Sequence, residues 1–473
     1  MTPLWRHQQQ ALDFISERWN SGRRGALLAI IMGGGKSRVA VEAAVLHDLR
    51  QVLILSPLRV VDVWREQFEL YAPEYHFASL DDRCATVGDK TRAAIDALNW
   101  AVTKYRPCAL AINYESARLP PFARWAGNRR WPLVITDESH RLKSPDGAIS
   151  RFVGRLGLVA NRRLALTGTP MPHSPLDVWA QFRFIDRTVY DPTYTSFRTR
   201  YAEMDSYFAS KVKSWKNLED LREKFFSLAF QVGPEVLDLP EEQDQYLSTT
   251  LSAEGARIYA QMERDLIAFI EAGGVITAAN QMVRLLRLAQ IVGGVVTDED
   301  GNERIVDENK RRLLEDLLED LAADEPVVVF CRFRADLAAV HTAAAALGRL
   351  SGELSGERDD LARWKRGGPE DPVILAVQIQ AGGVGVSLVR ARYGVYYSIG
   401  FSLADYLQSR ARLHRPGQTR PVLFYHLMVE GTIDHIIRGA LARRQDLIES
   451  VLQELPCKSH RPAKESLPAV PTP

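Results

Sequence analysis

The sequence predicts an α/β protein with two parallel-sheet domains and a helical insertion between them. Short apolar runs typical of buried strands alternate with amphipathic segments from Gly25 to about Asp186, and the same alternation resumes after Glu308. Strands that alternate with helices form parallel sheets covered by helices on both faces. The stretch between the two regions is charged, aromatic and mostly helical in its periodicity.

The first domain is expected to span residues 1–187. Its clearest strand, Gly25 to Ile31, is an uninterrupted apolar run that ends in a glycine cluster, and a helix is predicted from Lys36 to Leu49. Further apolar runs of strand length follow at residues 51–55, 108–112, 132–135 and 164–166, with an amphipathic segment at 60–70. Such short runs are typical of strands that are buried on both faces.

Residues 188–308 are predicted to be the helical insertion, with helices at 252–271 and 277–291. The second domain, residues 309–455, is expected to have strands at 326–330, 373–377, 394–397 and 422–427 and a helix at 335–347. Thr432 is a candidate N-cap for a closing helix, because a threonine side chain accepts a hydrogen bond from the first helical turn. Residues 456–473 are rich in proline and are predicted to be a disordered tail.

Composition favours a globular protein of several domains in a reducing, cytoplasmic compartment. Of the 473 residues, 46% are hydrophobic and 25% are charged. Lys and Arg number 60 against 59 Asp and Glu, so any nucleic-acid surface must be local. The four cysteines lack the paired spacing of zinc sites. No apolar run reaches the roughly 18 residues that a membrane span needs.

The glycine cluster carries the first chemical signal, because it lies between a predicted strand and a predicted helix. Glycines allow backbone N–H groups to converge on phosphate oxygens, and the helix N-terminus adds a favourable dipole. Lys36, which follows the glycines, would neutralise the β- and γ-phosphates of a nucleotide, and Ser37 would ligate Mg²⁺. A plain glycine-rich turn is the alternative, since Ile30 stands where the full phosphate-loop pattern has glycine. The nucleotide-binding candidates are Met32, Gly33, Gly34, Gly35, Lys36 and Ser37.

Two adjacent carboxylates end a later apolar run, at Asp137 and Glu138. Asp137 is expected to hold Mg²⁺, and Glu138 to position and deprotonate an attacking water. An acidic pair at this place could instead cap a helix and form its first turn. The phosphate loop upstream in the same predicted sheet favours the catalytic interpretation.

A third signal is an arginine-rich segment late in the second domain, residues 408–418, which reads Gln-Ser-Arg-Ala-Arg-Leu-His-Arg-Pro-Gly-Gln. Arg412 and Arg415 are three residues apart and would share one face if the segment were helical throughout. Arginine beside a γ-phosphate stabilises the charge of the transition state. A solvated helix face is the alternative for this segment.

In this order, the motifs resemble the Swi/Snf-type branch of the helicase-like ATPases of superfamily two. The resemblance covers nearly all residues from Leu4 to Leu455. Its most specific parts are the His-Arg-Leu-Lys at 140–143 after the acidic pair and the Arg-Pro-Gly-Gln at 415–418. The Thr-Gly-Thr-Pro at 167–170 and the Ala-Gly-Gly-Val-Gly at 381–385 resemble further motifs of the branch.

The resemblance implies two RecA-like domains that close on ATP and Mg²⁺, with Lys36, Glu138, Arg412 and Arg415 as the catalytic residues. It places Gln8 where the branch has an adenine-reading glutamine, and Gly385 next to the nucleotide. It also implies contacts to the backbone of double-stranded DNA. The residues expected to make those contacts are Ser56, Arg59, Asn113, Arg332, Gly382 and Gly383.

The function that follows is an ATP-dependent DNA translocase that moves along duplex DNA. A strand-separating helicase is the alternative within the enzymes, and a motor subunit of a nuclease or replication complex is a further one. A degenerate module that binds nucleotide or DNA without turnover belongs to a different class and conflicts with the full set of catalytic residues. The compact insertion and the lack of accessory domains favour a bacterial or viral source.

Overall fold

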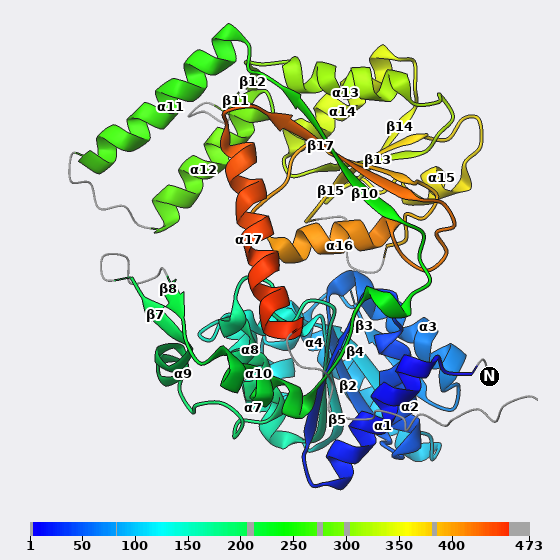
Figure 1. The fold of residues 1–473 in the computed structure, drawn as a ribbon. Coiled ribbons are helices and arrows are strands. Elements are labelled where there is room, and N and C mark those ends of the chain that lie inside the picture. Colours follow the sequence, from blue (N-terminus) through cyan, green and yellow to red (C-terminus); the bar gives the residue numbers. More distant parts are fainter. Residues whose placement is uncertain are drawn as a thin grey trace, which may run out of the picture.

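The computed structural model describes residues 3–81, 83–205, 212–271, 278–297, 303–380 and 386–453. Within these residues the chain forms two α/β lobes, each built on a parallel sheet. Figure 1 shows the first lobe, which is blue and cyan, below the second, which is yellow and orange. The predicted fold class, two parallel-sheet domains, is confirmed.

The sheet of the first lobe has seven strands in the order β3-β4-β2-β5-β6-β1-β9. The central strands are buried on both faces, as their uninterrupted apolar sequences predict. In sequence order the strands are β1 (Gly25–Ile30), β2 (Gln51–Ser56), β3 (His76–Leu80), β4 (Cys108–Asn113), β5 (Trp131–Asp137), β6 (Ala160–Thr167) and β9 (Ala229–Val232).

Helices cover both faces of this sheet and bury two apolar cores. One core lies under α1 (Arg6–Asn20), α2 (Lys36–Leu46) and α3 (Val61–Tyr71). The other core lies under α4 (Val87–Thr103), α6 (Phe122–Gly127), α7 (Ala148–Val159) and α8 (Val178–Ile185). Alternate residues of β1 enter opposite cores, with Leu27 in one and Leu28 in the other. Among the described residues, no helix is both long and apolar enough to cross a membrane.

The sheet of the second lobe has six strands in the order β10-β17-β16-β13-β15-β14. Helices α13 (Asn309–Asp320) and α14 (Arg334–Ala346) cover one face, and α15 (Leu361–Arg366) and α16 (Leu403–Leu413) cover the other. The strands are β10 (Glu242–Thr249), β13 (Val327–Cys331), β14 (Ser351–Leu354), β15 (Ile374–Gln378), β16 (Tyr393–Tyr396) and β17 (Val422–Val429).

The stretch predicted as a helical insertion, residues 188–308, also contains strands, and two of them join the sheets of the two lobes. β9 pairs in parallel with β1 of the first lobe, and β10 pairs in parallel with β17 of the second. The sequence hides β10 because this exposed edge strand is mostly polar and carries no apolar run. The other elements are α9 (Tyr194–Tyr201), β7 (Ala202–Met204), β8 (Val212–Trp215), α10 (Leu218–Leu228), α11 (Ala253–Glu271), α12 (Ala278–Val292), β11 (Val295–Thr297) and β12 (Glu303–Ile305).

The last described helix, α17 (Ile433–Gln453), joins the two lobes, and Figure 1 shows it in red running from the upper lobe to the lower. Ile433 and Ile437 lie in a cluster with residues of α11 and α12. Near its end, the same helix packs on the first lobe, where Val451 is part of the core and Leu452 packs against it. The predicted tail, residues 456–473, lies outside the described residues.

Candidate active site

The glycine cluster forms a tight loop between β1 and α2, as predicted. Gly33 and Gly35 have φ angles of 83° and 81°, a left-handed conformation that favours glycine. A Cβ at Gly35 would lie 2.1 Å from Nε2 of Gln8, and one at Gly33 would lie 2.7 Å from Cδ of Pro416. The loop is therefore enclosed by α1 on one side and by the second lobe on the other.

Lys36 and Gln8 both lie against this loop. The Lys36 ammonium donates to the carbonyl oxygens of Ile30 at 2.9 Å and Ile31 at 3.5 Å. Gln8 donates to the carbonyl of Gly34 at 3.3 Å and accepts from the N–H of Trp5 at 3.0 Å. Among the described residues, the hydrogen bonds of Lys36 go to neutral carbonyls, and the carboxylates that feel its charge make no direct ion pair with it. The ammonium can therefore contact an anion that enters the loop.

The carboxylate pair lies at the carboxyl end of β5, and the two residues are held differently. Asp137 accepts from the indole N–H of Trp64 at 3.0 Å and from the N–H of Glu138 at 2.9 Å. The hydroxyl of Tyr114 donates to the Asp137 carbonyl at 2.7 Å. Glu138 has a φ of 50°, a left-handed conformation that is uncommon for a residue with a side chain.

Burial and mutual repulsion set the two carboxylates apart in acidity. Burial raises the pKa of Asp137, and the charge of Glu138 raises it further against the pull of Lys36. Burial also opposes ionisation of Glu138, but contact with His140 and the charge of Lys36 leave its pKa below the ordinary value. Glu138 Oε2 is buried, and its one close polar neighbour among the described residues, His140 Nδ1 at 3.3 Å, is poorly aligned for a hydrogen bond. A buried anionic pair with an unsatisfied oxygen fits a divalent cation and a water.

His140 connects this pair to two other motifs, which the sequence did not predict. Its Nδ1 lies 3.3 Å from Glu138 Oε2 and 3.1 Å from the Thr167 hydroxyl. Its Nε2 lies 3.4 Å from the amide nitrogen of Gln408, in the second lobe. Only the places of these two residues in the sequence hinted at the contact: His140 follows the carboxylates, and Gln408 begins the arginine segment. His140 thus gives the first lobe a side-chain contact with the second beside the candidate general base.

The arginine segment forms α16 only as far as Leu413, so the prediction that Arg412 and Arg415 share a helix face is wrong. The helix ends before Pro416, which cannot continue it, and Gly417 has a φ of 102°. Arg412 is 6% exposed, and its Nη1 has no hydrogen-bond partner among the described residues. Burial lowers the pKa of Arg412 to about 10, with the nearby charge of Arg59 contributing.

Arg415 and Arg410 differ in how far they are paired. Arg415 makes a weak contact of 3.4 Å to the carbonyl of Val386, and burial lowers its pKa. Arg410 instead forms ion pairs of 2.5 Å with Asp244 and 3.0 Å with Glu242, both on β10. Arg410 is therefore a structural residue that attaches α16 to the edge strand.

The candidate nucleic-acid residues are brought to the facing edges of the two sheets, but few of them are exposed. Ser56 is fully buried and donates to the Pro57 carbonyl at 3.3 Å. Asn113, its neighbour in register, is 6% exposed and donates to Glu115 at 3.2 Å. Arg59 is exposed and donates to a second-lobe carbonyl, Ser355, at 3.2 Å. Gly382, Gly383 and Gly385 lie outside the described residues.

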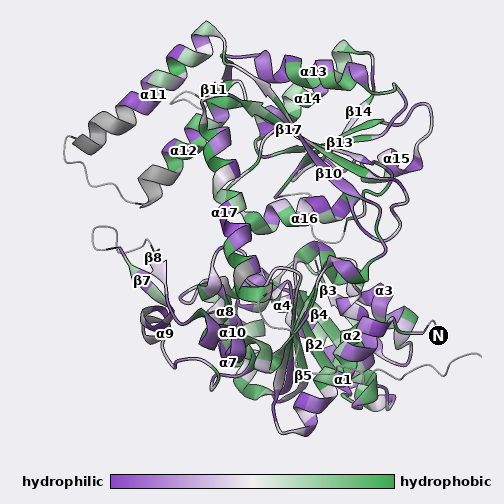
Figure 2. Cartoon of the chain, viewed as in Figure 1, coloured by the Kyte–Doolittle hydropathy of each residue, from purple (hydrophilic) through white to green (hydrophobic). Residues whose placement is uncertain are grey.

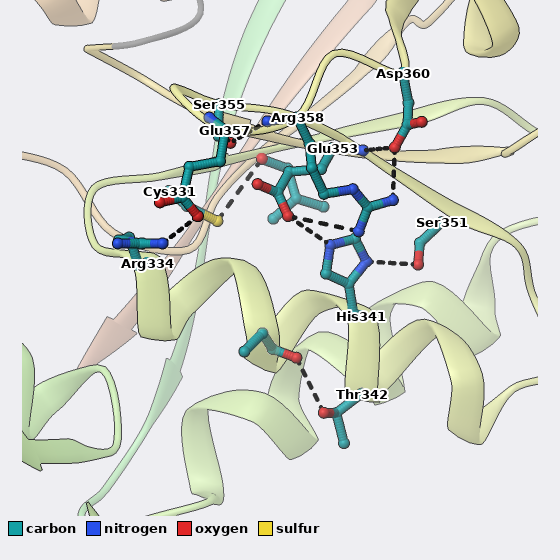
Figure 3. A network of polar contacts seen from close by, with 12 residues as sticks. Cys331, Arg334, His341, Thr342, Ser351, Glu353, Ser355, Glu357, Arg358 and Asp360 are labelled. Atoms are coloured by element: carbon teal, nitrogen blue, oxygen red, sulfur yellow. Dashed lines mark hydrogen bonds and ion pairs between the residues drawn. The ribbon is translucent and has the colours of Figure 1, made fainter. Parts of the chain in front are cut away.

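A network of polar contacts holds the turn that receives Arg59. Figure 3 shows Arg358 between Glu353 and Asp360, with Asp360 at 2.7 Å. The Ser355 hydroxyl accepts from the backbone N–H groups of Glu357 and Arg358 at 3.1 and 3.2 Å. The Ser355 carbonyl is therefore presented to the first lobe by a turn whose shape is fixed.

Arg332, the remaining predicted contact, directly follows β13 and lines a hollow of about 300 Å³ between the lobes. Burial lowers its pKa. His173 of the first lobe lines this hollow, and the other lining residues belong to the second lobe and α17. Its polar lining residues are His173, Arg332, Gln380, Ser402, Asp405 and Arg444.

Comparison with known proteins places this arrangement in a family. Residues 7–293 match the SNF2-related domain, and residues 309–417 match the helicase conserved C-terminal domain. The chain belongs to the SNF2-related family. The Swi/Snf-type resemblance deduced from the motifs is thereby confirmed for this SNF2-related chain.

Relatives of this SNF2-related chain are found in animals and bacteria. A chromodomain-helicase-DNA-binding protein 1-like of Danio rerio is 28% identical over 451 residues, which cover 91% of this chain and 42% of that protein. A putative ATP-dependent helicase/translocase, YwqA of Bacillus subtilis, is 26% identical, with 91% of this chain and 46% of that protein covered. This chain therefore spans less than half the length of these curated relatives.

Solved structures also resemble the chain. The SWI2/SNF2 ATPase core of Sulfolobus solfataricus in complex with dsDNA is 21% identical, with a TM-score of 0.45, covering 95% of this chain and 93% of that one.

Proposed function

We propose that this SNF2-related chain hydrolyses ATP in the cleft between its lobes and uses the energy to move along duplex DNA. The observation that carries the proposal is the meeting of both lobes at the phosphate loop. Pro416 of the second lobe lies against Gly33, and Gln408 contacts His140, so Arg412 and Arg415 belong to the segment that closes the site.

Each group at the site has a distinct role in this proposal. The loop N–H groups and Lys36 bind the phosphates, and Ser37 and Asp137 would hold Mg²⁺, which neutralises phosphate charge when bound. Glu138 accepts a proton from the attacking water as the water oxygen bonds to the γ-phosphorus and the bond to ADP breaks. The low pKa of Glu138 keeps it ionised for this role.

The arginines act as the lobes close. Arg412 is buried, Arg415 is partly buried, and both are poorly paired among the described residues. A γ-phosphate that gains charge in the transition state would be a better partner than their present surroundings. Closure and reopening of the lobes then coincide with binding and hydrolysis.

Duplex DNA as the partner is supported by the exposed Arg59 and by Arg332 at facing edges of the two sheets. Such contacts bind phosphates without reading sequence. The names of the relatives, a DNA-binding helicase and a helicase/translocase, agree with this choice.

The test is ATPase activity with no nucleic acid and with duplex DNA, single-stranded DNA or RNA. Duplex DNA should stimulate turnover most, and the protein should displace a triplex-forming strand without separating a forked duplex. Efficient separation of the fork would favour the helicase alternative. Near-normal turnover by Glu138→Gln, with the fold verified by circular dichroism, would overturn the active-site assignment itself.

A further inference from the structure

The edge of the first sheet that lies opposite the active site is strongly basic. All strands of this sheet are parallel, so their carboxyl ends share the edge that bears Lys36 and Asp137, and their amino ends share the other edge. In Figure 1 the turn between α1 and β1 lies at the bottom of the molecule, away from the second lobe, and Figure 2 shows hydrophilic purple there.

Arginine stands at the start of each of five neighbouring strands at this edge, in the sheet order β4-β2-β5-β6-β1. Neighbouring strands are about 4.8 Å apart, so four spacings span about 19 Å. This set, called the amino-edge arginines, consists of Arg106 before β4, Arg50 before β2, Arg129 and Arg130 before β5, Arg162 and Arg163 in β6, and Arg23 and Arg24 before β1.

Contacts between neighbouring strands connect several of these arginines at the surface, whereas Arg163 is buried and donates to the Phe184 carbonyl at 3.1 Å. Arg162 donates to the carbonyl of Arg23 at 3.1 Å. Arg129 donates to the side chain of Gln51 at 2.8 Å, beside Arg50. Most guanidinium groups at this edge are thus oriented by neutral acceptors, which leave their charge in place.

Acidic residues compensate little of this charge. Among the described residues, the ion pairs of the set are Arg23 with Asp186 at 3.2 Å and Arg50 with Asp48 at 3.9 Å. Burial lowers the pKa of Arg162, and the charge of Arg24 lowers it further. A chain with a net charge of only +1 therefore concentrates like charges on one edge, where an anionic partner would relieve their repulsion.

Exposed apolar and aromatic groups accompany the arginines. Tyr105 and Val102 are 88% and 64% exposed. They line a hollow of about 210 Å³ that also includes Arg50 and Arg106. Guanidinium groups beside an exposed aromatic ring suit sugars and bases as well as phosphates, which favours nucleic acid over an acidic protein.

We propose that the amino-edge arginines bind a second segment of nucleic acid through its phosphate backbone, independently of sequence. The span of about 19 Å corresponds to roughly five or six base-pair steps of duplex. The chain would then hold two segments at once, one at the cleft of the proposed function and one at the opposite edge.

A bridging assay tests this with the full chain. One duplex is fixed to beads, and capture of a second, fluorescent duplex is measured in the presence of the protein. Arg24 and Arg130 are exposed and have no acidic partner among the described residues, so Arg24→Glu with Arg130→Glu removes charge at little structural cost. The matched control is Lys365→Glu with Arg443→Glu, which makes the same charge change on exposed positions of the second lobe and α17.

The wild type and the control variant should capture the second duplex, and the Arg24/Arg130 variant should lose at least tenfold in capture. Its DNA-stimulated ATPase and its melting temperature should stay unchanged, so failure here is separable from failure of the proposed function. The slope of log affinity against log salt at this edge should fall by about 1.8, or 0.9 for each phosphate that is no longer neutralised. Repeating the capture with single-stranded DNA and RNA identifies the preferred nucleic acid.

Three results would overturn the proposal. The wild type could fail to bridge although duplex DNA stimulates its ATPase, the variant could bridge as well as the wild type, or poly-glutamate could compete as well as DNA at equal charge. The last result would assign the edge to an acidic protein partner instead. Failure to bridge without any stimulation by duplex DNA would contradict the proposed function.

Discussion

The two lobes hold their candidate catalytic side chains in different ways. In the first lobe Lys36 donates to two carbonyls, and Asp137 accepts from Trp64 and from a backbone N–H, so both are fixed before any ligand arrives. In the second lobe Arg412 has an unpartnered nitrogen among the described residues, and Arg415 has one long contact. In the proposed function, the first lobe is therefore arranged to bind the nucleotide, and the arginines of the second lobe gain a full partner when the site closes on a phosphate.

The contrast between the lobes predicts its largest effect at Glu138, the proposed proton acceptor in the first lobe. Glu138→Gln should lower the ATP turnover rate by about 10⁴-fold, the upper end for general-base catalysis, while ATP still binds. Lys36→Ala should lose binding as well, because phosphate charge is left uncompensated. Turnover and the binding of a fluorescent ATP analogue would be measured side by side. Equal losses of ATP binding in the two variants would contradict the assignment of Lys36 to phosphate binding and Glu138 to proton transfer.

Arg412→Ala and Arg415→Ala should lower turnover by about 10³-fold, the lower end for an arginine that stabilises phosphoryl transfer. ATP affinity should change little, since these arginines engage mainly in the transition state. The same two measurements apply. If ATP affinity and turnover rate fell by the same factor, the arginines would already contact ATP in the ground state. The two lobes would then not differ in how they hold their catalytic side chains.

The free energy of unfolding provides a third and smaller test of the contrast, because α16 carries both a poorly paired arginine, Arg412, and a well-paired one, Arg410. Arg412→Met should raise the free energy of unfolding without nucleotide by about 1–4 kcal/mol, because a buried and poorly paired charge is replaced by an apolar side chain. Arg410→Met is the matched control and should be destabilising, since it breaks the ion pairs with Asp244 and Glu242. Urea unfolding monitored by circular dichroism gives both values. A destabilised Arg412→Met would show that this arginine already has a structural role.

The smallest effect concerns the edge strand β10. Burial opposes ionisation of Asp244, but hydrogen bonds from His426 and Arg410 lower its pKa to about 2. A lowered pKa stabilises the fold above the ordinary value of 3.8, and this contribution is lost as the pH falls through about 2. Asp244→Asn should therefore cost about 1 kcal/mol at neutral pH, since partial exposure screens the pair. Unfolding measured from pH 7 to pH 2 should show the difference between wild type and variant shrink toward the acid end.

Sequence patterns predicted those parts of the molecule whose signal is local. The run from Gly25 into the glycine cluster, and the run that ends at Asp137, indicated strand ends with chemical groups, and both strands are present. Polar edge strand β10 carried no apolar signal, so its stretch was assigned to a helical insertion. Its place is set by pairing with β17, far away in the sequence.

At the candidate site, too, most of the features that the sequence did not predict depend on contacts between residues far apart in the chain. Arg412 and Arg415 were identified from their spacing, but whether the helix continues through both was decided by Pro416. The contact between His140 and Gln408 joins residues 268 positions apart and depends on how two lobes meet. Ser56 was predicted to contact DNA from its place in a motif, whereas its burial follows from packing that no local pattern encodes.

Helix α17 has a consequence for how the chain is made. Its residues are synthesised after both sheets, yet Val451 completes the core of the first lobe. N-terminal domains generally fold first during synthesis. Here the first lobe emerges from the ribosome with part of its apolar surface uncovered until the last helix arrives. A chain that stopped after β17 would therefore leave part of the first lobe's core without its cover.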